Sequence, residues 1–141
     1  CARVLEEHGA DYFGVAFLNE ALELRHAGIK TPILALGGVS GWQVDDFIVN
    51  DIDITASSIM KLDLIEQRAR ALGRRARVHL KIDTGMERIG VHHYSAGALL
   101  ERALRCREVE IAGVYSHFAM SEDPDPTFTR LQLSRFLEAI D

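Results

Sequence analysis

Short apolar runs alternate with segments of helical periodicity along almost the whole chain, and this alternation limits the fold more than any other feature of the sequence. We expect strands at residues 12–17, 31–36, 52–55, 77–82 and 110–116. Strands that alternate with helices over short connections predict a parallel sheet with helices on the outside. The sequence therefore indicates an α/β protein with about five consecutive parallel strands.

The expected helices are marked by start and stop residues. An opening helix ends at Gly9, the next is capped by Asn19 and ends at Gly28, and a short one covers residues 43–49. Ser57 or Ser58 caps a helix that Gly73 ends, and Ser95 caps another. The last helix opens at residues 125–129, and its expected inner face consists of Leu131, Leu133, Phe136, Leu137 and Ile140.

The alternation by itself fits either a closed barrel or an open doubly wound sheet. No Gly-x-Gly-x-x-Gly follows the first strand, and the phosphate-loop pattern Gly-x-x-x-x-Gly-Lys-Ser/Thr is absent. These two glycine patterns are typical of open sheets that bind nucleotides. Their absence favours a barrel.

Composition and charge exclude several classes of function. The 141 residues carry a net charge of −5 with acids and bases interleaved, so the sequence has no footprint of nucleic-acid binding. It has neither a transmembrane stretch nor a secretory signal, and we expect a cytoplasmic protein that does not bind membranes. Cys1 and Cys106 lack the companions of a disulfide framework or a zinc site, and His92 with His93 lacks a carboxylate at ligand spacing, so no metal is expected.

Polar residues gather where two neighbouring strands end. The first group is the run Lys81-Ile-Asp-Thr-Gly-Met-Glu-Arg-Ile-Gly90, and the second is His117 after the strand at residues 110–116. In parallel α/β proteins, ligands bind at the carboxyl ends of strands. We therefore expect Lys81, Arg88 and His117 to share one site, with Arg88 binding an anionic group through its planar guanidinium.

Each of these residues also has an interpretation without function. Lys81 could pair with Asp83 two positions along the strand, and Arg88 could be a solvated surface residue. His117 could be a polar group satisfied inside the fold. Met86 could belong to the core or could flank a bound ring.

The same residues carry a resemblance to a known family. The run 81–90, together with Gly113-Val-Tyr-Ser-His-Phe-Ala119, is similar to a pair of motifs in alanine racemases, and the similarity extends over essentially the whole chain. The resemblance implies part of a (β/α)₈ TIM barrel that binds pyridoxal 5'-phosphate. It also implies that Arg88 bonds the phenolic oxygen of the cofactor, that Lys81 is the lysine carbamylated in many members, and that His117 contacts the arginine facing the pyridine nitrogen.

The resemblance further implies a longer polypeptide, called the parent protein below. Its Schiff-base lysine would precede Cys1, while its tyrosine base, carboxy-terminal β domain and last barrel strands would follow Asp141, so that residues 1–141 are part of the barrel domain. The parent protein would be a homodimer that interconverts L- and D-alanine. Alternatives are a broad-specificity or serine racemase and a non-catalytic cofactor-binding barrel. We expect the isolated chain to fold poorly, because open sheet edges mispair, and to be inactive. Glu87 stands where the family usually carries another residue.

Overall fold

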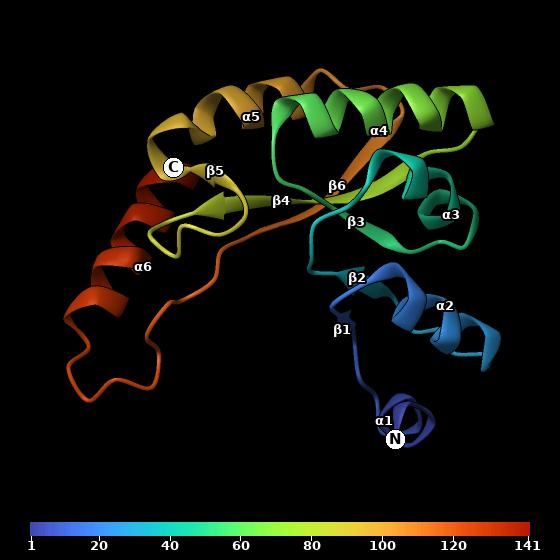
Figure 1. Cartoon of the computed structure of the whole chain (residues 1–141), viewed down its shortest axis with the longest axis horizontal. Helices are drawn as coiled ribbons and strands as arrows, with labels where there is room; N and C mark the ends of the chain where they lie inside the picture. Colours follow the sequence, from blue (N-terminus) through green and yellow to red (C-terminus); the bar gives the residue numbers. More distant parts are fainter.

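Parallel strands in the order β1-β2-β3-β4-β6 form the sheet of the computed structural model, which describes residues 1–141 (Figure 1). A sixth strand, β5, contributes two residues that pair with the end of β4. The strands are β1 (Phe13–Val15), β2 (Ile33–Ala35), β3 (Asp53–Ala56), β4 (Ala76–Asp83), β5 (Val91–His92) and β6 (Val109–Tyr115). The five predicted strands are confirmed, and only β5 was not expected.

Six α-helices connect or flank these strands. They are α1 (Ala2–Glu7), α2 (Leu18–His26), α3 (Val44–Val49), α4 (Ile59–Leu72), α5 (Ala96–Leu104) and α6 (Thr127–Ile140), with two 3₁₀ turns, η1 (Gly41–Gln43) and η2 (His93–Ser95). None of the helices combines the length and the apolar character needed to cross a membrane.

The helix boundaries follow most of the predicted signals, although Ser95 precedes α5 without making a side-chain hydrogen bond to it. Ser58 caps α4, since its Oγ accepts the Lys61 N–H at 3.1 Å, and Gly73 ends the helix with φ of 62°. Asn19 was predicted as the cap of α2, which is wrong, because the helix already begins at Leu18. The carboxylate of Glu20, the third residue of the helix, instead reaches back and accepts the N–H groups of Ala16 at 2.6 Å and Phe17 at 3.4 Å, just before the helix begins.

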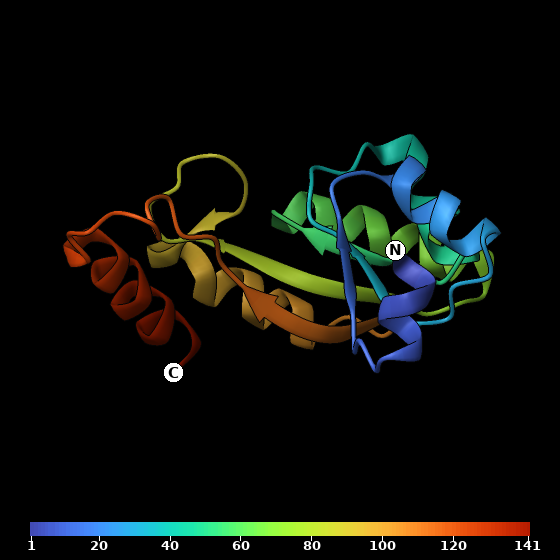
Figure 2. The ribbon, with the colours of Figure 1, turned by 90° about the horizontal axis from the view of Figure 1, so that it is seen from below.

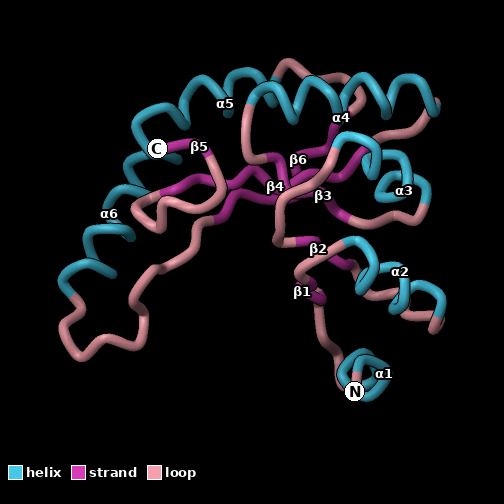
Figure 3. The backbone as a smooth tube through the Cα atoms, viewed as in Figure 1, coloured by secondary structure: helices cyan, strands magenta, loops and turns pink.

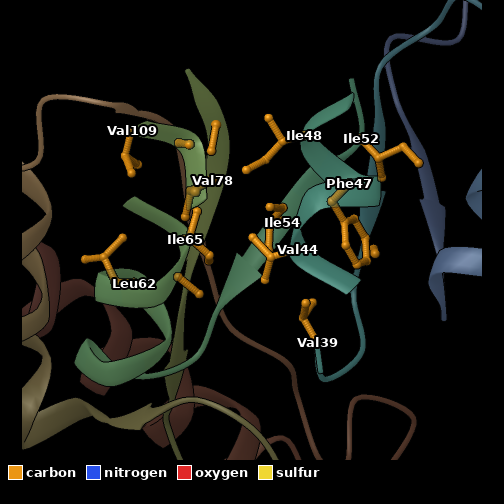
Figure 4. Close-up of a cluster of buried hydrophobic side chains, with 14 of the residues drawn as sticks. Val39, Val44, Phe47, Ile48, Ile52, Ile54, Leu62, Ile65, Val78 and Val109 are labelled. Carbon is orange, nitrogen blue, oxygen red and sulfur yellow. The ribbon is translucent and has the colours of Figure 1, made fainter. Parts of the chain in front are cut away.

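One face of the sheet packs against helices α2 to α5 and forms the core. Every second residue of β4 points toward these helices, so that Val78, Leu80 and Ile82 are at most 1% exposed. Ile54 of β3 packs with them against α3 and α4 (Figure 4). A single cluster of 20 buried apolar residues results, and it fixes the positions of the strand ends.

The opposite face of the sheet is polar. The alternate residues of β4 lie there, namely Arg77, His79, Lys81 and Asp83, together with Asp53 and Thr55 of β3. Figure 2 shows β4 (yellow-green) and β6 (orange) running side by side, and they are the two longest strands. In a closed barrel this face lines the interior.

Two parts of the sequence prediction are corrected by the burial of side chains. Strand β1 was expected to be covered on both faces, but Gly14 is exposed and its neighbours are half-buried. The expected inner face of α6 is wrong, because Leu131, Leu133, Leu137 and Ile140 are each 44–51% exposed. The helix instead reaches the sheet through Gln132, which is fully buried.

Candidate functional site

The four residues predicted from the sequence line one shallow pocket at the carboxyl ends of β4 and β6. Lys81 lies on β4, Met86 and Arg88 lie in the loop that follows it, and His117 lies just beyond β6. Figure 3 shows these two loops leaving adjacent strands at the same end of the sheet. The structure therefore brings the predicted residues of the two strand ends together at one edge of the sheet.

Asp83 shapes the loop that carries Arg88. Its carboxylate accepts backbone hydrogen bonds from Gly85 at 2.9 Å, Glu87 at 3.1 Å and Arg88 at 3.0 Å. Burial alone would raise the pKa of Asp83, but these donors outweigh it and hold the pKa below its usual value. The carboxylate is thus ionised and bound within its own loop.

Lys81 does not form the ion pair with Asp83 that was its alternative interpretation. Its side chain is 4% exposed, and Nζ makes no hydrogen bond or ion pair with another residue of the chain. The amine lies over the ring of Tyr115, 4.7 Å from its centroid. Burial, followed by the charge of Arg88, lowers the pKa of Lys81, and Asp83 opposes this shift only in part. Lys81 is therefore a buried amine without an anionic partner.

His117 lies at the edge of this pocket, which the ends of β4 and β6 and the loops after them form and which is called the rim below. It is held there through its backbone. Its carbonyl accepts a hydrogen bond from Gln132 Nε2 at 3.0 Å. Burial and the charges of Arg88 and Lys81 lower the pKa of the imidazole. A neutral imidazole beside two cationic side chains can accept a hydrogen bond as well as donate one.

Gln132 is a positioning residue that sequence reasoning did not single out. Its amide nitrogen also donates to Thr84 Oγ1 at 3.1 Å, and its amide oxygen accepts from the Ala119 N–H at 2.9 Å. It thereby ties α6 to the ends of both β4 and β6. The sequence feature that indicates this role is a glutamine among the apolar residues of the last helix, and helical periodicity of apolar residues does not detect it.

A second polar cluster fills the sheet face below Lys81. Asp53, with a side chain 2% exposed, accepts hydrogen bonds from Tyr12 at 2.5 Å and Arg77 at 3.1 Å and lies 3.1 Å from His79 Nε2. Burial would raise the pKa of Asp53, but His79, Tyr12 and Arg77 together lower it. The alternation of Arg77, His79 and Lys81 along β4 was the sequence signal for this cluster.

The rim offers hydrogen-bond donors to an anion. The guanidinium of Arg88 is exposed and bound to no carboxylate of the chain, while Lys81 lacks a partner and Asp83 is turned into its loop. A hollow of about 450 Å³ adjoins the rim, and Ser57, Glu87, Arg88 and His92 are among its lining residues. A guanidinium with no carboxylate partner can bind a planar anionic group through two parallel hydrogen bonds.

These features define a segment of a parallel α/β barrel with the cationic side chains of Lys81 and Arg88 at its strand ends. The sequence model of the family described as "Alanine racemase, N-terminal domain" matches residues 1–141. The chain belongs to this family.

Curated relatives are more than a third identical to the chain over the residues that match. Alanine racemase 1 of Oceanobacillus iheyensis is 38% identical over 136 residues, which cover 96% of the chain and 36% of that protein. The alanine racemase of Geobacter sulfurreducens is 39% identical over 142 residues, which cover 99% of the chain and 37% of that protein. The chain therefore spans somewhat over a third of the length of these relatives.

Solved structures match the fold equally well. An alanine racemase of Clostridium difficile superimposes with a TM-score of 0.95 at 34% identity, covering 99% of the chain and 37% of that protein. The alanine racemase of the D-cycloserine producer Streptomyces lavendulae gives 0.93 at 38% identity, with 99% and 37% covered. A histidine racemase of Leuconostoc mesenteroides gives 0.88 at 26% identity, with 96% and 37% covered. The partial barrel predicted from the sequence is confirmed.

Proposed function

We propose that the parent protein is an amino-acid racemase that depends on pyridoxal 5'-phosphate and interconverts L- and D-alanine. The observation that carries this proposal is the meeting of Lys81, Arg88 and His117 at one rim of a barrel segment whose relatives are alanine racemases. A bound pyridoxal phosphate would supply the electron sink that makes the α-proton of an amino acid removable.

Arg88 is the residue that we assign to the cofactor ring. Its guanidinium would donate to the phenolic oxygen and to the substrate carboxylate, both of which are anionic acceptors. The hydrogen bonds from the loop to Asp83 fix the start of the Arg88 side chain, so that little conformational freedom is lost on binding. Met86 would contact the cofactor ring, and His117 would contact the arginine that faces the pyridine nitrogen.

Lys81 is the residue that we assign to carbamylation. An amine must be neutral to react with carbon dioxide, and the burial of Lys81 beside Arg88 favours the neutral form. The product is a carboxylate, which Arg88 would bind and which would in turn orient the guanidinium. The lack of any other partner for Lys81 Nζ supports this assignment.

The groups that move the α-proton lie outside residues 1–141 in this proposal. The 141-residue chain alone should therefore not racemise alanine, while the parent protein should. Formation of D-alanine from L-alanine, followed with a stereospecific oxidase, tests both statements. The substitution Arg88→Ala should lower kcat/KM by roughly 10²-fold or more, because a charged hydrogen bond to substrate and cofactor is lost. Arg88→Lys retains the charge but not the paired donors and should recover only part of this loss.

The same assay separates the alternatives. The fold likeness to a histidine racemase favours testing serine and histidine beside alanine, and a comparable kcat/KM on all three would identify a broad-specificity racemase. A parent protein that binds the cofactor without racemising any of them would be a binding protein. Because a structure of the Clostridium difficile enzyme contains cycloserine, inhibition by this compound is a further check.

We also propose that the parent protein is a homodimer in which each subunit completes the site of the other. Sedimentation equilibrium measures the mass. A monomer with full racemase activity would contradict this part of the proposal.

A further inference from the structure

The ring of Tyr115 is fixed at its hydroxyl end across the polar face of the sheet. Tyr115 Oη lies 2.7 Å from Thr55 Oγ1, and Thr55 Oγ1 lies 2.7 Å from the carbonyl oxygen of Ala35. The single hydroxyl proton of Thr55 is used by that carbonyl, so Tyr115 must be the donor to Thr55. A directed chain of hydrogen bonds therefore runs from β6 to β3 and on to β2.

A histidine supports the same ring from below. The rings of His79 and Tyr115 meet edge to face, with centroids 6.4 Å apart and planes at 74°. His79 is held in turn by Asp53, whose Oδ2 lies 3.1 Å from Nε2. Burial raises the pKa of Tyr115, so the phenol stays neutral. The Tyr115 ring is thus held in place and uncharged, and it is called the platform below because Lys81 lies over it.

Lys81 rests on this platform. Lys81 and Tyr115 are register partners on neighbouring strands, and Nζ lies 4.7 Å from the ring centroid. The face of a neutral aromatic ring attracts an ammonium group but not a neutral amine. The ring therefore favours the charged form of Lys81, while burial and the nearby Arg88 favour the neutral form.

We propose that Tyr115 is a positioning residue for Lys81, whose ring holds the ammonium group beside Arg88 and sets the pH above which the amine can react with carbon dioxide. This inference rests on the proposed function, in which Lys81 is carbamylated. In that reaction the nitrogen lone pair forms a bond to the carbon of carbon dioxide, one C=O π pair moves to oxygen, and an amine proton leaves to water. Only the unprotonated amine has the lone pair, so a contact that stabilises the ammonium delays the reaction to higher pH.

Other charged groups face Lys81 from the elements packed around it. Arg88 and Asp83 approach from β4 and its loop, His117 approaches from the end of β6, and Asp53 with His79 lies one layer below. None of them makes a hydrogen bond or an ion pair with Nζ, whereas the ring of Tyr115 contacts it directly. Removal of the ring should therefore change the protonation of Lys81 without removing any charge from its surroundings.

The test compares three variants in the parent protein. Tyr115→Phe keeps the ring face and loses the hydroxyl, whereas Tyr115→Leu and Tyr115→Met lose the face, and Met fills the space with a flexible side chain. Carbamate on Lys81 is followed by ¹³C NMR with ¹³C-bicarbonate as a function of pH. In a separate sample freed of carbon dioxide, so that Lys81 carries no carbamate, the protonation of Lys81 is read by competitive acetylation with acetic anhydride and mass spectrometry, which needs no cofactor.

We expect the wild type and Tyr115→Phe to share one midpoint of Lys81 protonation. The midpoint should fall by roughly one pH unit in Tyr115→Leu and Tyr115→Met, the size of a buried cation–π contact. A purely structural role of Tyr115 would reduce stability in these variants without moving the midpoint, and that result would overturn the inference. A shift in Tyr115→Phe as large as that in Tyr115→Leu would also overturn it.

The two readouts keep this inference separate from the proposed function. If the midpoint of acetylation moves as expected but no carbamate and no racemase activity are found, the positioning of Lys81 stands and the proposed function fails. If carbamate and activity are present but the midpoint does not move, the proposed function stands and the role of Tyr115 is refuted.

Discussion

Asp83 Oδ2 accepts the backbone N–H of Arg88 at 3.0 Å, so the residue that ends β4 fixes the start of the side chain that we assign to the ligand. Two further N–H groups, those of Gly85 and Glu87, bond to Oδ1 of the same carboxylate. The Asp83 carboxylate thus accepts hydrogen bonds from three N–H groups of the loop that would otherwise bond to water.

The first prediction concerns this loop. Asp83→Ala should speed the hydrogen exchange of the Gly85, Glu87 and Arg88 amides by roughly 10- to 100-fold, since a hydrogen bond to a charged group contributes about 1.5–3 kcal/mol. Asp83→Asn keeps one acceptor oxygen and should give an intermediate effect. Exchange measured by NMR in the parent protein gives the rates, and unchanged rates in Asp83→Ala would contradict the assignment of Asp83 as the organiser of the loop.

The pH dependence of the same interaction has a definite sign. Because the folded state holds the pKa of Asp83 below its ordinary value near 3.8, the ionised carboxyl stabilises the fold. This contribution is complete above the ordinary pKa and is lost as the pH falls through the lowered pKa. In acid, the stability of the Asp83→Asn variant should therefore decline less steeply than that of the wild type, and urea denaturation between about pH 5 and pH 2 tests this.

The second prediction concerns Glu87, which adopts a left-handed backbone conformation with φ of 55°. Glu87→Gly should stabilise the parent protein by about 1 kcal/mol, because a Cβ atom is costly in this conformation and the greater freedom of glycine when unfolded offsets part of the gain. Glu87→Ala is the matched control. It keeps the Cβ atom and removes only the exposed carboxylate, which lies 3.6 Å from His92 Nδ1.

Urea denaturation measures both variants of Glu87. The control should stay within about 0.5 kcal/mol of the wild type, since exposed ion pairs contribute little. If Glu87→Ala stabilised the protein as much as Glu87→Gly, repulsion by the carboxylate and not backbone conformation would be the cause.

Strand positions and the gathering of Lys81, Arg88 and His117 could be predicted because both depend on local pattern. Apolar runs mark buried strands, and parallel strands place their carboxyl ends at one edge regardless of the details of packing. The polar alternation along β4 even indicated which way Lys81 points. These inferences needed no knowledge of which side chains touch.

The remaining features depend on contacts between residues distant in the sequence. Asp83 does not pair with Lys81 because backbone N–H groups of the following loop bind its carboxylate. The contact of Lys81 with Tyr115 follows from the register of β4 with β6, two strands that are separated in the sequence by a loop and a helix. The inner face of α6 was misassigned because periodicity counts apolar residues, while the buried contact of this helix is an amide.

The third prediction concerns that amide. Gln132→Leu preserves the approximate volume but leaves the Ala119 N–H and the His117 carbonyl without their partners. Two backbone groups that lose their hydrogen bonds should cost about 2–3 kcal/mol in the free energy of unfolding. Ser134→Ala, on the exposed side of the same helix, should change it by less than about 0.5 kcal/mol. Faster hydrogen exchange of the Ala119 amide in Gln132→Leu would show that the loss of stability arises at this contact.

Gln132→Glu refines this third prediction. Its carboxylate still accepts from Ala119 but cannot donate to Thr84 or to His117 unless it is protonated. Its stability should therefore rise toward that of the wild type as the pH is lowered to about 5. A variant that instead became less stable over this range would show that the donor side of Gln132 is dispensable.

The fourth prediction concerns Gly113, where the register between β4 and β6 shifts. A Cβ atom at Gly113 would lie 2.8 Å from His79 Nδ1 and 3.1 Å from its Cε1. The His79 ring cannot yield easily, because Asp53 holds its other nitrogen at 3.1 Å and the Tyr115 ring lies against it at 74°. Gly113→Ala should therefore destabilise the parent protein by about 1–3 kcal/mol, as overpacking does elsewhere.

The matched control for Gly113 is a glycine with free space around it. Gly97 in α5 has no heavy atom within 4 Å of a Cβ position, so Gly97→Ala should stabilise the helix by roughly 0.5 kcal/mol. Opposite signs for the two substitutions in urea denaturation would confirm that the space beside His79 is filled. If Gly113→Ala also left the midpoint of Lys81 acetylation unmoved, the displaced His79 would not act on Lys81 through Tyr115, and the platform beneath the amine would consist of the tyrosine and its hydrogen bond to Thr55 alone.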